Sequence, residues 1–134
     1  MADIALQTAN RVEVAQSFIQ HTLPAAEAIT AGAPVRIDTS GNFTNSNGTT
    51  TTEAATWGIA TKTVVAGEAL TAIRKGIMDG FTFAGAYGST VYVSDTDGRL
   101  ADAAGTVSKI AGTVLPGTAN LLGAAKAKLL LVDL

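Results

Sequence analysis

One short pattern occurs twice in this chain, as GAPVRIDTSGNFT at residues 32–44 and as GSTVYVSDTDGRLA at residues 88–101. Each copy has a glycine, a few residues of extended character, a turn rich in Asp, Thr, Ser and Gly, and a second short extended piece. Glycine adopts the positive φ that tight turns require, and Val, Ile and Tyr suit the pleated surface of a sheet. The pattern therefore predicts two β-hairpins.

The similarity continues beyond each hairpin. A segment containing glycine, a turn and an apolar strand follow in the same order, at 58–60, 66–68 and 69–73 after the first copy and at 112–114, 116–118 and 129–132 after the second. We expect a duplicated all-β unit, folded as a small β-barrel or β-sandwich body built from hairpins. Its repeated positions carry no reactive side chains, which favours a structural or binding protein over an enzyme.

The remaining pattern predicts where strands begin and end. Trp57–Val65 alternates and is expected to be a central strand, Lys75–Gly76 to be a bulge or bend, and Gly112 to break a long strand. Residues 45–56 are polar and predict a flexible loop, and a brief helix is expected only at 119–127. The expected strands are 34–38, 42–44, 57–65, 69–74, 76–83, 90–94, 99–101, 107–115 and 128–133.

The composition limits the kind of partner. Of the 134 residues, 47% are hydrophobic and only 15% are charged, against about a quarter in typical proteins. The net charge of −2 and the scattered basic residues argue against direct binding to nucleic acid, because phosphate binding needs clustered positive charge. No apolar run approaches the ~20 residues that span a bilayer, so we expect no membrane partner. A weakly charged surface favours association with other proteins.

Residues 1–24 differ from the rest of the chain, because they contain no copy of the repeat and no helical periodicity. They predict an extended N-terminal arm, followed by one β-barrel or β-sandwich domain at 25–134. The alternative is a tail with one strand that pairs with its own domain. No secretory signal is visible at the start, so synthesis in a cytoplasm is expected. The apolar residues of the arm are expected to contact a neighbouring subunit or partner: Val12, Val14, Phe18, Ile19 and Leu23.

Few side chains offer chemistry. His21 is the only histidine and no cysteine is present, so neither a catalytic triad nor a zinc site based on these residues is expected. Asp95, Asp97 and Asp102 resemble the start of a calcium loop, but the loop is incomplete and its residues equally suit a turn, which we favour. No phosphate-binding glycine loop is present. We expect no catalytic residues, no metal site and no cofactor.

Four segments carry a resemblance to a known family. They are AGAPV at 31–35, AGEALT at 66–71, RKGI at 74–77 and GSTVYV at 88–93, and their order along the chain is similar to that in the small capsid decoration, or cement, proteins of tailed bacteriophages. The resemblance covers roughly residues 25–134. It implies a compact β-barrel or β-sandwich on the outside of an assembled phage head.

The resemblance also implies a function and partners. Such proteins bind the major capsid protein and bridge neighbouring capsomers, often as homotrimers at three-fold positions, and belong to the outer capsid surface of the virion. The resemblance therefore predicts a structural virion protein that stabilises the head. The alternative is a small β-module of a phage tail or fibre that binds glycan or a host surface, for which exposed aromatic residues are expected.

Overall fold

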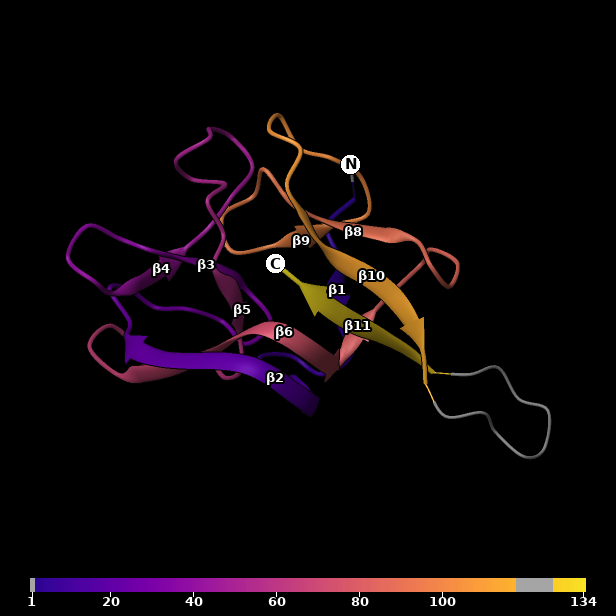
Figure 1. Ribbon diagram of the computed structural model, residues 1–134, viewed down its shortest axis with the longest axis horizontal. Helices are drawn as coiled ribbons and strands as arrows, with labels where there is room; N and C mark the ends of the chain where they lie inside the picture. Colours follow the sequence, from indigo (N-terminus) through magenta and orange to yellow (C-terminus); the bar gives the residue numbers. More distant parts are fainter. Residues whose placement is uncertain (1, 118–126) are drawn as a thin grey trace.

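The computed structural model describes residues 2–117 and 127–134, and within them the fold is all-β with no helix. Its strands form a strongly curled antiparallel sheet, a half-barrel of the small β-barrel and β-sandwich type (Figure 1). The predicted fold class is therefore confirmed. The brief helix expected at 119–127 lies outside the described residues except for its last position.

The strands are short except for two. β2 and β6 have 12 and 11 residues, and all the other strands described have between two and seven. In chain order the strands are β1 (Ala5–Leu6), β2 (Glu13–Pro24), β3 (Pro34–Ile37), β4 (Phe43–Asn45), β5 (Gly58–Ala60), β6 (Ala69–Asp79), β7 (Phe81–Thr82), β8 (Thr90–Val93), β9 (Leu100–Ala101), β10 (Ile110–Pro116) and β11 (Lys128–Asp133).

β6 is the strand around which the main sheet is arranged. The sheet runs in the order β4-β3-β5-β6-β11-β10-β8-β9, and β2 joins it by pairing with β6. β2 follows the whole length of β6 on one edge. The other edge of β6 is shared, because β5 pairs with Ala72 and Ile73 and β11 pairs with the stretch from Lys75 to Met78. β1 and β7 form a separate two-stranded sheet.

Two hydrophobic clusters lie against this sheet, and β6 contributes to both. The first core cluster comprises Ile4, Ile59, Ile73, Met78, Phe81, Phe83, Val91, Val93, Leu100, Ala111, Val114, Leu130 and Val132. The second core cluster comprises Ala25, Ile29, Ala33, Val35, Phe43, Ala60, Val64, Leu70 and Ala72, with Leu23 and Trp57 packed beside it. Aliphatic residues dominate both clusters, as the low aromatic content of 5% requires.

The repeated hairpins are confirmed. β3 pairs with β4 and β8 pairs with β9, both antiparallel. Glycines at equivalent places in the two copies have positive φ, with Gly32 at 83° matching Gly88 at 83°, and Gly41 at 84° matching Gly98 at 69°. L-residues with a Cβ rarely adopt this conformation, so the glycines that the repeat preserves are those the turns need.

Three predicted strands differ most from the observed ones, and of the others only 128–133 has its predicted bounds. The strand expected at 57–65 is only Gly58–Ala60, because the chain then turns away and Thr63 Oγ1 accepts a hydrogen bond from the main chain of Ala31 (3.0 Å). The strands expected at 69–74 and 76–83 are largely one, β6, which ends at Asp79 before Gly80. The expected irregularity near Lys75 is present as a register shift against β2.

The polar segment at 45–56 is better anchored than its composition predicts. The buried hydroxyl of Ser46 donates to the main-chain oxygen of Glu53 (2.6 Å) and hydrogen-bonds Thr56 Oγ1 (2.6 Å). The Glu53 carboxylate lies 3.3 Å from the Arg36 guanidinium. In this structure these bonds fold the segment onto β3, because small hydroxyl side chains satisfy the main-chain groups that a loop leaves unpaired.

The N-terminal segment corrects the expectation of a separate arm. Its backbone is extended, as expected, but it lies against residues 25–134 of its own chain. The amide of Ile4 donates to the main-chain oxygen of Leu100 (2.9 Å), and the Ile4 side chain belongs to the first core cluster. β1 pairs with β7 and β2 pairs with β6. The burial of apolar side chains and the pairing of strands within the same chain together favour this arrangement.

We predict that Gly112→Ala strongly destabilises the fold. A Cβ at this position would lie 1.8 Å from the main-chain oxygen of Leu131 on the neighbouring strand β11. The loss is expected to be about 3 kcal/mol, the upper range for overpacking. Gly67→Ala is the control, because Gly67 has φ of 88° but open space around it and should lose only about 1–2 kcal/mol. Urea unfolding measures both, and equal losses would contradict the prediction.

We also predict that Ile4→Ala costs about 2–4 kcal/mol of unfolding free energy, the usual range for truncation in a core. The side chain of Ile4 is only 8% exposed. Val14→Ala is the matched control on the same N-terminal segment, since Val14 is 40% exposed and should lose less than about 1 kcal/mol. Thermal and urea unfolding compare them. An Ile4→Ala protein as stable as the wild type would show that the segment is a detachable arm after all.

Candidate interaction surface

β2 forms a long outer edge of the main sheet (Figure 1). It pairs only with β6 among the described residues, so its second edge has no partner strand there. At roughly 3.3 Å per residue the 12-residue strand is about 40 Å long. Eleven of its positions are exposed and only Leu23 is half-buried. An edge of this length presents a row of main-chain donors and acceptors to solvent.

The other ends of the sheet differ from this edge. The strand order ends at β4 with three residues and at β9 with two. Asp3 also forms a bridge to Ala101 of β9. Proteins usually protect long edges with lysine, central proline or inward charge. β2 has only Glu13 and His21 as ionisable side chains and its one proline, Pro24, is its last residue. It is therefore protected mainly by its bulges.

The five predicted contact residues divide into two groups. Val12 is half-buried and packs against the first core cluster, and Leu23 is half-buried and packs against the second. These two residues hold the segment onto its own domain. Val14, Phe18 and Ile19 are exposed to 40%, 62% and 43%. Only these three remain available for contact with another molecule.

The register of β2 explains why Phe18 is so exposed. Ser17 pairs with Gly76 and Ile19 pairs with Lys75, so Phe18 between them has no partner on β6. A second shift leaves Ala15 unpaired between Val14 and Gln16. Such bulges re-aim side chains and increase local twist. Gly76 permits the close approach, because a Cβ there would lie 2.5 Å from the main-chain oxygen of Gln16.

His21 belongs to a ring cluster that holds the end of β2. Its ring lies 6.1 Å from that of Trp57, which in turn lies 5.7 Å from the ring of Phe43. The Arg74 guanidinium lies over Trp57 at 5.7 Å and donates to its main-chain oxygen (3.0 Å). This packing gives His21 a structural role at the second core cluster.

The acidic turn at 95–102 uses its carboxylates for separate protein contacts. Asp95 accepts hydrogen bonds from the amide and the hydroxyl of Thr106 (2.9 and 2.8 Å). Asp97 accepts from Asn47 Nδ2 (3.1 Å), and Asp102 accepts from the amide of Ala2 (3.0 Å). In residues 2–117 and 127–134 no group of three or more His, Cys, Asp or Glu side chains is arranged to hold a metal ion. The turn is therefore hydrogen-bonded to three other segments of the chain, at Ala2, Asn47 and Thr106.

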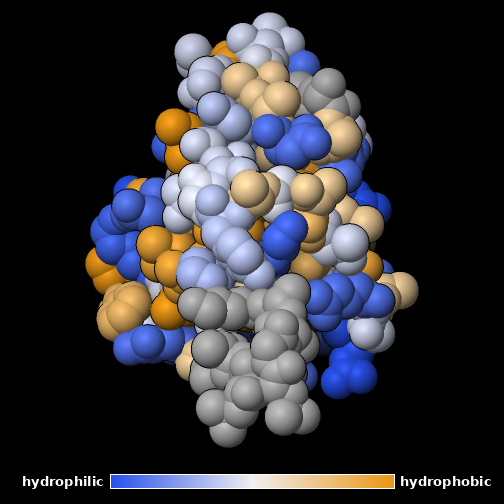
Figure 2. Space-filling model, turned by 90° about the vertical axis from the view of Figure 1, so that its right-hand side faces the viewer, coloured by the Kyte–Doolittle hydropathy of each residue, from blue (hydrophilic) through white to orange (hydrophobic). Residues whose placement is uncertain are grey.

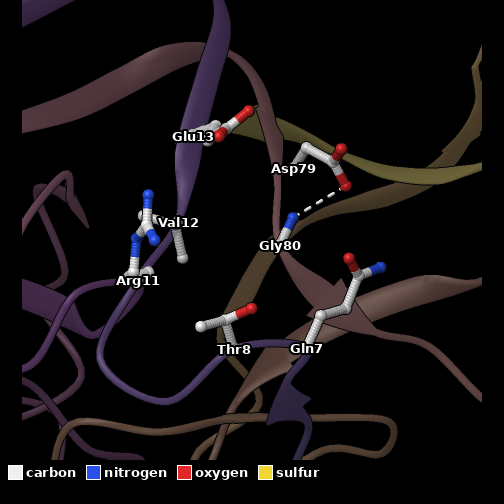
Figure 3. A pocket seen from close by; sticks show the side chains of 7 residues that line it. All are labelled: Gln7, Thr8, Arg11, Val12, Glu13, Asp79 and Gly80. Carbon is white, nitrogen blue, oxygen red and sulfur yellow. Dashed lines mark hydrogen bonds between the residues drawn. The ribbon is translucent and has the colours of Figure 1, made fainter.

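A polar cleft of about 220 Å³ lies where β2 begins (Figure 3). Its lining includes the carboxylates of Glu13 and Asp79, which are cross-strand neighbours, and the Arg11 side chain. The Asp79 carboxylate accepts a hydrogen bond from the amide of Gly80 (2.7 Å). Sequence reasoning missed this cleft, because Glu13 and Asp79 meet only through the β2–β6 register. Like charges on neighbouring strands repel each other, so a hydrogen-bond donor or a cation between the two carboxylates would be favourable.

The side of the molecule beside β10 and β11 has a different character. Figure 2 shows hydrophobic residues there in small groups between hydrophilic ones. Single exposed apolar residues are ordinary on protein surfaces and indicate no site. Within the part of the chain that the structure describes, there is also no helix with the length and apolarity to cross a membrane.

Comparison with known proteins adds no family. No protein-family model matches the chain. No curated protein matches it significantly either. The function must therefore be argued from the residues and the structure.

We predict that the acidic turn is held by protein contacts alone. Asp95→Ala should lower the unfolding free energy by about 1 kcal/mol, since it removes two hydrogen bonds on a half-buried carboxylate. Thermal melts of the wild type in excess calcium and in chelator should agree within error. A large rise in melting temperature with calcium that is lost in Asp95→Ala would contradict this and indicate a calcium site.

Proposed function

We propose that this protein is a capsid decoration, or cement, protein of a tailed bacteriophage. In this proposal it binds the major capsid protein on the outer surface of the head and bridges neighbouring capsomers. It acts as a homotrimer at three-fold positions, has no catalytic activity, and needs no cofactor, nucleic acid or membrane. The order of the four segments that resemble this family, at 31–35, 66–71, 74–77 and 88–93, supports the proposal, and so does the surface described above.

One observation carries the proposal further than the sequence does. Val14, Phe18 and Ile19 are all exposed on one long edge strand of a compact body, although they do not all share one face of it. A fully buried apolar side chain of this size contributes about 1.5–3 kcal/mol before ordering costs. Three such residues on a strand that is already extended supply a moderate affinity without a large ordering penalty. This combination suits a protein that binds a repetitive surface in many copies.

The charge distribution favours a protein partner. The chain carries 15% charged residues and a net charge of −2. β2 itself carries one carboxylate and no lysine or arginine. Phosphate-rich partners require clustered basic side chains, whereas a weakly charged strand suits another protein surface.

Cementing requires no more chemistry than this surface offers. A protein that binds only the assembled shell stabilises it by linkage, because every bound copy lowers the free energy of the intact state relative to separated capsomers. Each site needs only modest affinity, since the lattice repeats it many times. A rigid all-β body with exposed anchors is sufficient for this role.

The proposal is tested on particles of the phage whose genome encodes this chain. Gold-labelled antibodies against the protein should decorate the head uniformly in electron micrographs. Label found only at the tail would overturn the proposal and favour the alternative, a tail or fibre module that binds glycan or a host surface. Label on no part of the particle would overturn both.

Binding to empty heads that lack the protein gives the residue-level prediction. Phe18→Ser should weaken binding about tenfold or more, because a tenfold change corresponds to 1.4 kcal/mol and the side chain is 62% exposed for contact. Ile110→Ser is the matched control, an apolar residue 50% exposed on β10, and should bind as the wild type does. Both variants should keep the wild-type melting temperature within a few degrees. Full-strength binding by Phe18→Ser would remove β2 from the capsid contact.

A further inference from the structure

We propose that the free main-chain edge of β2 pairs with β2 of a second copy of this chain, antiparallel and across a two-fold axis at Ser17. The inference goes beyond the proposed function, because it concerns two-fold association of the purified protein in solution and not the three-fold arrangement proposed on the capsid. It uses the edge of the strand, whereas the capsid contact uses the exposed side chains. The two sheets would then join into one.

The occupant of such an edge must itself be an extended strand. Unpaired main-chain N–H and C=O groups along 12 residues are satisfied most fully by another main chain at strand spacing. The short ends of the sheet at β4 and β9 offer no comparable length. The partner strand that fits this edge best is therefore one with the same length and the same bulges, and a second copy of β2 has both.

Val14 and Gln20 lie at equal distances along β2 on either side of Ser17. Cross-strand partners share a face of the sheet, and the buried residues Met78, Gly76 and Ile73 are the partners of Val14, Ser17 and Gln20. These three residues of β2 therefore share one face, and Ser17 Oγ indeed donates to Gln20 Oε1 (2.9 Å). They are equally spaced, and one residue of β2 without a partner on β6 lies on each side of Ser17, namely Ala15 before it and Phe18 after it.

This spacing fits an isologous contact. When two β2 strands pair antiparallel about Ser17, the residue Val14 lies opposite Gln20 of the second copy, and Ser17 lies opposite Ser17. Each pair then shares a face, as an antiparallel ladder requires. A two-fold axis repeats every contact twice, which is the usual geometry of protein dimers. A strand of another protein would not in general have bulges that match those at Ala15 and Phe18.

The charges fit the same register. Glu13 lies opposite His21 of the second copy, and the imidazole N–H can donate to the carboxylate. Within its own chain Glu13 faces Asp79, and in the described residues it takes part in no salt bridge. The pairing therefore supplies a donor where the isolated molecule places two carboxylates side by side. Glu13 and His21 are the only ionisable side chains of β2, so the pairing places no like charges opposite each other.

Cysteine cross-linking tests the register directly, because the chain contains no cysteine. Opposite residues of an antiparallel pair have Cα atoms about 4.5–5.5 Å apart, within the range a disulfide spans. Purified Ser17→Cys should form a disulfide-linked dimer under mild oxidation. Gln20→Cys is the matched control, since its two copies would lie about 20 Å apart along the paired strands. Equal yields from both variants would overturn the proposed register.

A second measurement does not depend on the cysteine variants. Sedimentation equilibrium of the wild type should show a concentration-dependent association that Ser17→Lys weakens at least tenfold, because it places two ammonium groups opposite each other. Gln20→Lys should associate as the wild type does, since its lysine would face Val14. Circular dichroism checks that each variant is folded. A wild type that shows no association at any concentration, or one that Ser17→Lys leaves unchanged, would overturn the proposal. Neither experiment uses a phage capsid, so both stand or fall separately from the proposed function.

Discussion

The pairing of β6 with three other strands is the constraint on which the rest of the structure depends. β6 holds β2 along one edge and divides its other edge between β5 and β11. Its register shift at Arg74 lets Leu70 and Ala72 reach the second core cluster while Ile73 and Met78 reach the first. A straight alternation would direct Ile73 and Met78 to opposite faces. The irregularity therefore allows one strand to serve both clusters.

Local turn chemistry made much of the fold predictable from the sequence. The repeated glycines and the Val- and Ile-rich pieces specified the β3–β4 and β8–β9 hairpins, and Lys128–Asp133 was predicted with its observed bounds. The length of β5 could not be predicted, because it ends where Thr63 bonds to Ala31 and not where alternation ends. Contacts between distant segments are invisible to periodicity.

The candidate surface was predicted only in part, for the same reason. Apolar character identified Val14, Phe18 and Ile19, which are exposed, but equally Val12 and Leu23, which pack on the core. Only the β2–β6 register separates these groups. The bulge at Phe18 arises from a register shift between two strands that are far apart in sequence, so the local sequence of β2 does not predict it.

The position of Ile4 has a consequence for how the chain reaches its final state. Ile4 packs in the same cluster as Leu130 and Val132, close to the opposite end of the chain. Folding therefore has to bring together residues more than 120 positions apart, and contacts so distant in sequence slow folding. During synthesis Ile4 has no complete cluster until β11 has left the ribosome. Until then the apolar side chains of the N-terminal segment stay exposed to solvent. We therefore expect the chain to be most prone to aggregation at this stage.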